Sequence, residues 1–368
     1  MMSCEKKVLV TGCAGFIGSH TAEELLRRGT SVVGVDIMSD YYDPELKLEN
    51  LRILRDTAAA AKVAFTFYQA DVAIRDAMEE VFRKEVKVDS VCHLAARAGV
   101  RPSLLEPELY VQTNVQGTVV LLDLARKYGV RNFVYASSSS VYGGNTKVPF
   151  AETDPVDHPV SPYAATKRAC ELMAATYHQL YQLPVTGLRF FTVYGPRGRP
   201  DMAPFKFVDR ISRGLPVERF GDGTTCRDYT YIDDIVSGVI AALDHPLGCE
   251  IVNLGNSHVV SLNDFIALTE SLVGKKAVIK QLPNQPGDVP LTYADCTKAH
   301  RLLGYEPQFD IKRGMECLVR WYAAFYRQRN EASDEVVKTR PVAMPPASSS
   351  ESSPMTSEFE FENSSEDE

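Results

Sequence analysis

Short apolar segments recur along the first half of the chain, and stretches with helical spacing separate most of them. Apolar residues in TAEELLRRG and YVQTNVQGTVVLLDLARKYG repeat at the spacing of one helix face. Strands that are apolar on both faces and joined by helices indicate an α/β fold with a doubly wound parallel sheet. The predicted strands are residues 7–11, 31–36, 65–71, 90–96, 132–138 and 185–191.

The pattern loosens after about residue 192, where the segments GPRGRPD, GDGTTCRDY and NQPGD predict loops between shorter elements. We expect a smaller C-terminal α/β lobe that covers the carboxyl ends of the sheet strands, where ligands of such folds bind. The predicted sheet domain comprises residues 1–185 together with about 230–255. The predicted smaller lobe comprises residues 186–229 and 256–330.

The acidic charge of the chain is concentrated near its C-terminus. Residues 341–368 hold seven acidic residues and no Lys or Arg, and they account for all but one unit of the net charge of −8. The remaining chain is nearly neutral, which argues against a nucleic-acid partner. Because the end of the chain is rich in Ser and Glu and poor in aliphatic residues, we predict a disordered tail over residues 331–368. It either increases solubility or carries phosphorylation sites.

The eight cysteines are scattered and form no CxxC pair or Cys/His spacing, so we expect reduced thiols and no metal site. No run of about 18 apolar residues occurs, and the first residues lead directly into a predicted strand without a signal region. These features predict a cytoplasmic protein without a membrane partner.

The first predicted strand runs into VTGCAGFIGSH, in which Gly12, Gly15 and Gly18 have the spacing GxxGxxG. Glycines here permit a tight turn and close approach of a pyrophosphate to the start of a helix, where Phe16 and Ile17 lie. The second strand ends at Asp36, whose carboxylate can bind the adenosine ribose and repel a 2′-phosphate. The pattern favours NAD over NADP as the cofactor. A glycine turn that serves only helix packing is the alternative.

The segment SPYAATK places Tyr163 and Lys167 four residues apart, on one face of a predicted helix. A free phenol has a pKa near 10, but a neighbouring ammonium and a positive nicotinamide ring favour the phenolate. Such a tyrosine can take a proton from a sugar hydroxyl while hydride leaves the same carbon for the cofactor. Alone, this spacing is more typical of an ordinary surface pair, because Tyr and Lys are common residues.

Together with YASSSSVYG and HLAARAGVR, these motifs resemble the extended short-chain dehydrogenase/reductases, in the NAD-dependent epimerase/dehydratase family. The resemblance covers roughly residues 6–325. It implies that the sheet domain is a Rossmann-type domain that binds NAD and that the C-terminal lobe binds a UDP- or GDP-sugar. It implies that Tyr163 is the catalytic base, that Lys167 is its partner and that Ser138 is a hydroxyl that binds the reacting oxygen, with Ser139 and Ser140 as alternatives. The implied further cofactor contacts are Asp71, Val72, Leu94, Ala95, Ala96 and Asn114. We also expect Tyr163 and Lys167 to contact the cofactor, because the remaining donors of Lys167 can bind the nicotinamide ribose.

The resemblance also excludes two classes of reaction. Family members that eliminate water carry an Asp-Glu pair after the catalytic hydroxyl, and decarboxylating relatives usually carry a Glu there, but this chain has Ser139 and Ser140. The reaction that remains is 4-epimerisation with retained NAD. The enzyme oxidises C4 of the sugar, the 4-keto sugar rotates in the site, and the enzyme then reduces it again. A hexose or pentose 4-epimerase and a non-enzymatic NAD-binding scaffold are the alternatives.

The segments DYYD, RFFTVYGP and GRPDM together resemble UDP-glucuronate 4-epimerases, which interconvert UDP-glucuronate and UDP-galacturonate. Thr192 stands where hexose epimerases commonly have Asn. Gln285, Arg197 and Arg97 depart from the family pattern. By analogy, the helices at about 107–128 and 161–182 form a homodimer interface, although their apolar residues equally suit the core. The proposed substrate contacts are Thr192 and Arg199 for the carboxylate, Arg101 for the sugar or pyrophosphate, Arg227 for the diphosphate and Asp288 for the uridine ribose, with loop salt bridges as the alternative for the arginines.

Overall fold

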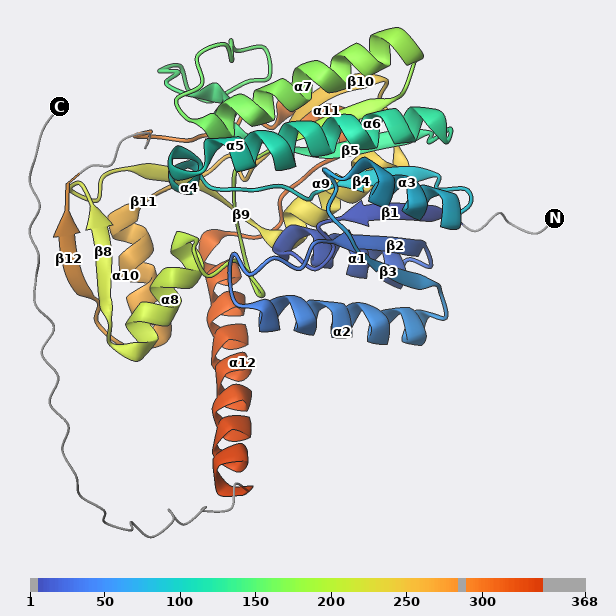
Figure 1. Ribbon diagram of the computed structural model, residues 1–368. Coiled ribbons are helices and arrows are strands. Elements are labelled where there is room, and N and C mark those ends of the chain that lie inside the picture. The colour runs from blue at the N-terminus through green and yellow to red at the C-terminus, as the bar shows by residue number, and fades with distance from the viewer. Residues whose placement is uncertain (1–5, 284–288, 340–368) are drawn as a thin grey trace, which may run out of the picture. The chain divides into compact units, whose positions relative to one another are not determined.

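Seven parallel strands form the central sheet of the computed structural model, which describes residues 6–283 and 289–339 (Figure 1). The strand order is β10-β6-β5-β4-β1-β2-β3, which confirms the predicted doubly wound α/β class. β2 is buried at every position, as its continuous apolar run predicts. The strands are β1 Lys7–Thr11, β2 Ser31–Asp36, β3 Phe65–Gln69, β4 Ser90–His93, β5 Asn132–Ser138, β6 Val185–Phe190 and β10 Cys249–Leu254.

Three predicted strands end early. β3 ends at Gln69, β4 at His93 and β6 at Phe190. The residues that follow each of them leave the sheet and line a cavity. β10, from the second half of the chain, pairs in parallel with β6 and completes the sheet. The carboxyl ends of the strands therefore receive loops from both halves of the chain.

The helices form two groups around the sheet. Helix α1 packs against α2 and α9, and α6 packs against α3 and α7. Buried side chains from β1, α3, α6 and β5, among them Leu9, Met78, Leu121 and Phe133, share one core cluster. The helices are α1 Phe16–Arg27, α2 Pro44–Ala61, α3 Arg75–Lys84, α6 Gly117–Lys127, α7 Pro162–Tyr181 and α9 Ile232–Asp244.

The helix predicted over residues 107–128 contains a π-helical turn. α4 Val100–Leu105 and α5 Pro107–Tyr110 precede the π-helix Val111–Gln116, which runs directly into α6. Gly117 follows the turn, and a Cβ there would lie 2.8 Å from Cγ2 of Val72. Glycine thus allows this helix to approach the loop after β3 closely.

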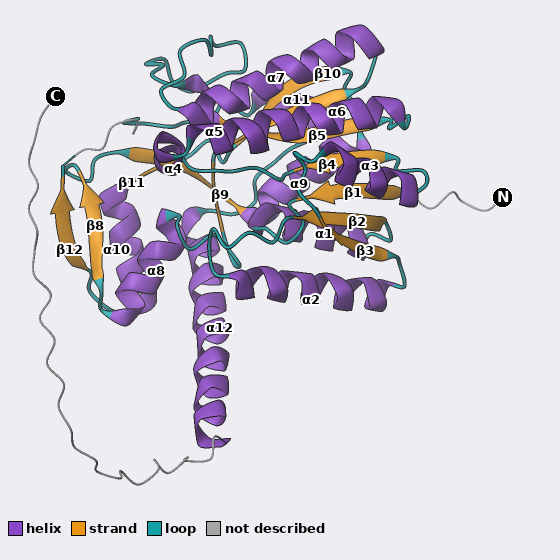
Figure 2. Ribbon diagram, in the orientation of Figure 1, coloured by secondary structure: helices purple, strands orange, loops and turns teal. Residues whose placement is uncertain are grey.

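Apart from the long helix α12, the segments of the second half of the chain outside the central sheet form short strands and helices (Figure 2). β7, β9 and β11 make a three-stranded sheet, β8 and β12 make a parallel pair, and α8 packs against α10. A short 3₁₀-helix, Ser139–Tyr142, follows β5. The remaining elements are β7 Thr192–Tyr194, α8 Ala203–Arg213, β8 Pro216–Phe220, β9 Cys226–Tyr231, β11 Val259–Ser261, α10 Leu262–Val273, β12 Val278–Leu282, α11 Thr297–Leu303 and α12 Ile311–Thr339.

The chain up to Ala324 forms one compact unit, and a second unit begins at Phe325. The division of the first unit into a cofactor domain and a substrate lobe stays a prediction. Helix α12 continues to Thr339, so the predicted tail begins too early at 331. Four of the eight residues in EASDEVVK, the two Glu, the Ala and the Lys, are strong helix formers, and Pro341 follows shortly afterwards. The rest of the predicted tail, 340–368, lies outside the described residues. Within the described part of the chain, no helix is both long and apolar enough to cross a bilayer.

Candidate active site

A cavity of about 790 Å³ lies where the strands of the central sheet end. Its walls come from the loops after β1, β2, β3, β4 and β5 on one side. Residues of β7, the loop after β7, α8 and β9 form the other side. The cavity therefore joins the predicted cofactor site to the predicted substrate site.

The glycine loop after β1 forms one wall of this cavity. Gly12 has a φ of +71°, and a Cβ there would lie 2.8 Å from the backbone nitrogen of Ala95. A Cβ on Gly18 would lie 2.0 Å from the carbonyl oxygen of Gly12. Gly15 caps α1 without a side-chain hydrogen bond, which leaves the first amides of the helix for an anion. This arrangement fits the pyrophosphate of a dinucleotide. All five predicted residues of this loop line the cavity: Gly12, Gly15, Phe16, Ile17 and Gly18.

Asp36 lies at the end of β2, beside the glycine loop. Its Oδ2 accepts a hydrogen bond from the amide of Ala14 at 3.1 Å, and its Oδ1 accepts one from the amide of Met38 at 2.9 Å. The buried ammonium of Lys47 lies 3.7 Å from Oδ1 and donates to Ser39 Oγ at 3.1 Å. Burial lowers the pKa of Lys47, although Asp36 acts in the opposite direction. The oriented carboxylate fits the ribose contact expected of it.

Seven of the eight remaining predicted cofactor contacts line the cavity, namely Asp71, Val72, Leu94, Ala95, Ala96, Tyr163 and Lys167. Asn114 does not, because it lies behind the wall and is 1% exposed. Its Oδ1 accepts from the Arg97 amide at 2.8 Å, and its Nδ2 donates to the Arg97 carbonyl at 3.0 Å and to Thr166 Oγ1 at 3.0 Å. Asn114 thus attaches the cavity loop after β4 to helix α7.

The buried His93 links the same loop to β1 through a directional hydrogen-bond chain. Its Nδ1 lies 2.8 Å from Thr11 Oγ1, and its Nε2 lies 3.1 Å from Thr118 Oγ1. Thr118 donates to the Asn114 carbonyl at 2.6 Å, so we assign the proton to Nε2 of the imidazole. Burial, assisted by the positive charge of Lys167, lowers the pKa of His93 to about 3. The imidazole is therefore neutral at physiological pH.

Helix α7 presents the predicted catalytic pair to the cavity. Ser161 Oγ accepts a hydrogen bond from the amide of Ala164 at 3.1 Å and caps the helix, which places Tyr163 in the first turn. Lys167 lies one turn later and is 5% exposed. Its Nζ donates to the carbonyl of Ala136 at 2.8 Å, which leaves two further hydrogens on the ammonium. Tyr163 and Lys167 both line the cavity.

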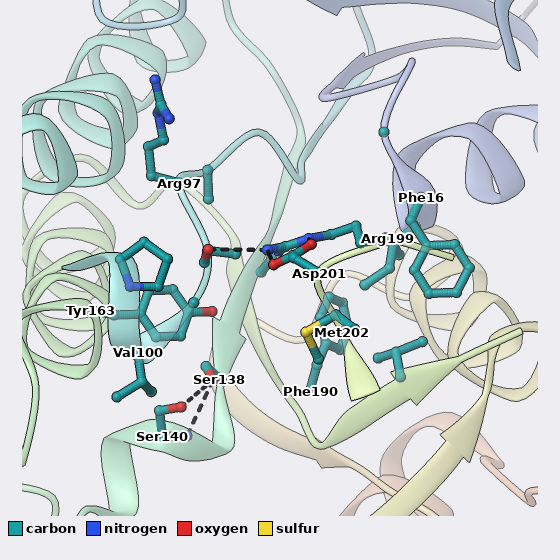
Figure 3. Close-up of a pocket in the computed structure, with 18 of the residues that line it drawn as sticks. Phe16, Arg97, Val100, Ser138, Ser140, Tyr163, Phe190, Arg199, Asp201 and Met202 are labelled. Atoms are coloured by element: carbon teal, nitrogen blue, oxygen red, sulfur yellow. Dashed lines mark hydrogen bonds and ion pairs between the residues drawn. The ribbon is translucent and has the colours of Figure 1, made fainter. Parts of the chain in front are cut away.

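Ser138, Ser139 and Ser140 all line the cavity at the end of β5. Ser138 caps the 3₁₀-helix, since its Oγ accepts from the Ser140 amide at 3.2 Å and lies 3.1 Å from Ser140 Oγ. Figure 3 shows Ser138 and the Tyr163 hydroxyl on the same side of the pocket. A hydroxyl from β5 and a phenol from α7 therefore converge on one region.

Arg199 lies in the pocket, where it is already bound by a carboxylate (Figure 3). Its Nε donates to Asp201 Oδ1 at 3.0 Å, and its Nη2 donates to Asp201 Oδ2 at 2.6 Å and to the Ala98 carbonyl at 3.1 Å. Tyr41 also donates to the Ala98 carbonyl, at 3.3 Å. None of these contacts uses the two hydrogens on Nη1 of Arg199, which leaves them for a second anion.

Three other predicted substrate residues, Thr192, Arg101 and Arg227, line the cavity. The Arg101 guanidinium lies 4.4 Å from the centre of the Phe220 ring, and Arg227 Nη1 donates to the Cys226 carbonyl at 2.9 Å. Asp288 and Gln285 lie outside the described residues. The two unusual arginines differ: Arg197 pairs with Glu23 on α1, whereas Arg97 lines the cavity and stacks on Tyr41.

Sequence reasoning missed Asp201, Lys47, Tyr41 and His93. Asp201 stands two residues after Arg199 in the GRPDM segment, so this spacing was a usable signal. Tyr41 belongs to the DYYD segment, and His93 begins HLAARAGVR, but neither motif indicates a partner. Lys47 carried no recognisable signal. These roles depend on segments that meet only in the fold.

Comparison with known proteins agrees with this geometry. The model of the NAD-dependent epimerase/dehydratase family matches residues 8–255. A UDP-glucuronate 4-epimerase from Thermodesulfobacterium geofontis is 47% identical over 314 residues, covering 85% of this chain and 95% of the relative. The structure of Bacillus cereus UDP-glucuronic acid 4-epimerase with UDP-glucuronic acid and NAD has a TM-score of 0.80 and 36% identity, covering 87% and 100% of the two chains.

A second solved structure binds a neutral hexose. The Thermotoga maritima UDP-glucose 4-epimerase with UDP-glucose has a TM-score of 0.79 and 35% identity, covering 87% of this chain and 99% of that one. Fold similarity alone therefore does not distinguish the two sugars. The family match, the relatives and the cavity agree, and this chain belongs to the NAD-dependent epimerase/dehydratase family.

Proposed function

We propose that this protein is a UDP-glucuronate 4-epimerase that interconverts UDP-glucuronate and UDP-galacturonate and retains its NAD. One observation carries the proposal: a continuous cavity joins the glycine loop, Tyr163 and Ser138 to Thr192 and Arg199. The relative from Thermodesulfobacterium geofontis bears the same activity in its name, at 47% identity.

The glycine loop, Asp36 and the residues after β3 and β4 would hold the cofactor. When bound, NAD supplies the acceptor for the C4 hydride of the sugar and the donor for its return. Tyr163 takes the proton of the sugar 4-hydroxyl, and the Ser138 hydroxyl binds the same oxygen. After rotation of the 4-keto sugar, Tyr163 returns the proton to the oxygen. Lys167 provides positive charge one helical turn from Tyr163.

The carboxylate of the sugar must also be held so that the 4-keto intermediate does not lose CO₂. A 4-keto uronate is a β-keto acid, which loses CO₂ most readily when its carboxylate bond is perpendicular to the carbonyl plane. Thr192 and the free Nη1 edge of Arg199 hold the carboxylate near that plane and slow decarboxylation. Arg227 binds the diphosphate, Arg101 the sugar or the pyrophosphate, and Asp288 the uridine ribose.

The activity is tested by incubating the purified protein with UDP-glucuronate, without added NAD, and following the products by proton NMR. UDP-galacturonate without CO₂ is the expected product, and Tyr163→Phe should lose nearly all turnover while keeping NAD. Conversion of UDP-glucose but not UDP-glucuronate would favour a hexose 4-epimerase, the candidate suggested by the similarity to the Thermotoga maritima enzyme. Absence of turnover with either sugar, even with NAD supplied, would overturn both assignments.

We further propose that the protein is a cytoplasmic homodimer. Several apolar side chains on α4, on the π-helix that follows α5 and on α7 are exposed in the single chain. Their exposed fractions are 47% for Leu104, 84% for Leu105, 53% for Val111 and 54% for Leu172. A second copy would cover them. Leu172→Glu should then convert the dimer into a monomer in light-scattering measurements, whereas a wild-type monomer would contradict the proposal.

A further inference from the structure

One helical turn after Lys167, Glu171 of α7 forms a buried ion pair with Arg189 of β6. Arg189 Nε donates to Glu171 Oε1 at 2.8 Å, and Arg189 Nη2 donates to Glu171 Oε2 at 2.9 Å. Each residue is 2% exposed. The two parallel hydrogen bonds fix the direction of the carboxylate as well as its distance from the guanidinium.

Two further groups bind the same carboxylate. Ser137 Oγ donates to Glu171 Oε1 at 2.6 Å, and Arg168 Nη1 donates to Oε2 at 3.1 Å. Ser137 and Arg189 are register partners on the adjacent strands β5 and β6. Burial alone would raise the pKa of Glu171, but the hydrogen bonds from Arg189, Ser137 and Arg168 lower it. An ionised carboxylate on α7 is therefore held by both neighbouring strands.

The ion pair complements the contact made by Lys167. Lys167 binds the Ala136 carbonyl and Glu171 binds Ser137, so residues one helical turn apart on α7 contact consecutive residues of β5. Four helical residues span about 6 Å along the helix axis. Two contacts separated by this length fix both the axial position and the rotation of α7 against the sheet. Ser138 is the next residue of β5.

A merely stabilising role does not require this pair. Removing two charges from water is costly, and an apolar pair of similar volume often gives equal or greater stability. An apolar contact, however, tolerates sliding of a helix over a sheet, whereas a two-pronged ion pair does not. The geometry therefore supports a role in the relative placement of α7 and β5.

We propose that Glu171, bound by Arg189 and Ser137, is a positioning residue that sets the placement of Tyr163 relative to Ser138. The inference rests on the catalytic roles proposed for those two residues. It assigns no contact with the substrate to Glu171. Its loss should consequently affect the chemical step more than the binding of the nucleotide sugar or the cofactor.

The test uses Ser137→Ala in the full-length protein, because this change removes one hydrogen bond to Glu171 without leaving a buried charge unpaired. We expect kcat to fall about tenfold, since small misplacements of catalytic groups are costly. The KM of the nucleotide sugar and the NAD content should stay within about twofold of wild type. Glu171→Gln removes the charge and should lower kcat further, together with Tm.

Thr269→Val is the matched control. Thr269 on α10 is fully buried and donates to the Phe265 carbonyl at 2.8 Å, so the change also deletes a buried hydroxyl. It should lower Tm without lowering kcat. If Ser137→Ala changes kcat no more than Thr269→Val does, the positioning role is overturned. Should Tyr163→Phe retain turnover, the proposed catalytic roles fail instead, which separates the two results.

Discussion

Arg199 and Asp201, two residues apart in the loop after β7, form a two-pronged ion pair inside the cavity, with N–O distances of 3.0 and 2.6 Å. Asp201 thus occupies the edge of the guanidinium formed by Nε and Nη2. A substrate carboxylate must use the remaining Nη1 edge or displace Asp201. Arg199 is consequently both a loop anchor and a candidate substrate contact, and mutagenesis can separate these roles.

Arg199→Met should raise the KM for UDP-glucuronate by about 10- to 100-fold, because charge-assisted hydrogen bonds contribute about 1.5–3 kcal/mol. Binding of UDP-glucose, which has no carboxylate, should change much less. Arg199→Lys should lie between wild type and Arg199→Met, since an ammonium lacks the fork of a guanidinium. Steady-state kinetics and calorimetric binding with both nucleotide sugars provide the measurement.

Asp201→Asn is the matched control, because it weakens the ion pair while Arg199 remains. Because this change acts through the loop, it should alter the KM values for UDP-glucuronate and UDP-glucose to the same extent. If Arg199→Met and Asp201→Asn impair both sugars to the same extent, Arg199 is only a loop anchor and its proposed contact with the uronate is wrong.

The three serines at the end of β5 have different positions and contacts, which predicts different kinetic effects. Ser138→Ala should lower kcat by about 10²-fold, because it removes a donor to the reacting oxygen, while binding of UDP-glucuronate is kept. Ser140→Ala should have a smaller effect, through loss of its contact with Ser138 Oγ at 3.1 Å. A larger loss in Ser139→Ala than in Ser138→Ala would transfer the catalytic role to Ser139.

Local patterns predicted the parts of the site that depend on short spacing. Apolar runs placed β1, β2 and β5 at their observed bounds, and the i, i+4 rule placed Tyr163 and Lys167 on one helix face. The glycine spacing likewise placed the turn before α1. Each of these features is set by neighbouring residues in the chain.

Long-range contacts account for what was missed. Asn114 fits a sequence motif for a cofactor contact, yet the π-helical turn places it behind the wall, bound to Arg97. His93 pairs with Thr11, which is 82 positions away, and spacing does not reveal that contact. The tail was predicted from residue 331 on the composition of the end of the chain, which does not describe 331–339, where helix α12 continues.

Asp36 should control cofactor retention. Asp36→Asn replaces the carboxylate by a neutral amide, which accepts weaker hydrogen bonds from the ribose hydroxyls. We therefore expect the affinity for NAD to fall by about tenfold or more. The NAD released on denaturation of the purified protein and calorimetric titration of the cofactor-free protein measure this. Asp56→Asn, at an exposed position of α2, is the control. Equal NAD content in both variants would contradict the ribose contact.

The neutral, buried His93 should make the protein less stable in acid. Its pKa is about 3 in the folded state, against about 6.5 for an unfolded chain. Above pH 6.5 neither state binds the proton, so stability from His93 is fully present. As pH falls from 6.5 towards 3, only the unfolded state binds it, and about 1.4 kcal/mol is lost per pH unit. Between pH 7 and pH 5 the loss is about 2 kcal/mol, or several degrees in Tm.

His93→Gln removes this titration and should reduce the Tm difference between pH 7 and pH 5, even if its Tm at pH 7 is lower. Comparison with wild type is necessary because burial raises the pKa of Asp228 to about 6, which stabilises the folded state as pH falls. His20, whose pKa is lowered by burial and by Arg197, acts in the same direction as His93 and is unchanged in the variant. The exposed His245→Gln is the control. If His93→Gln and His245→Gln keep the same pH dependence of Tm, the imidazole of His93 does not remain neutral in the folded protein.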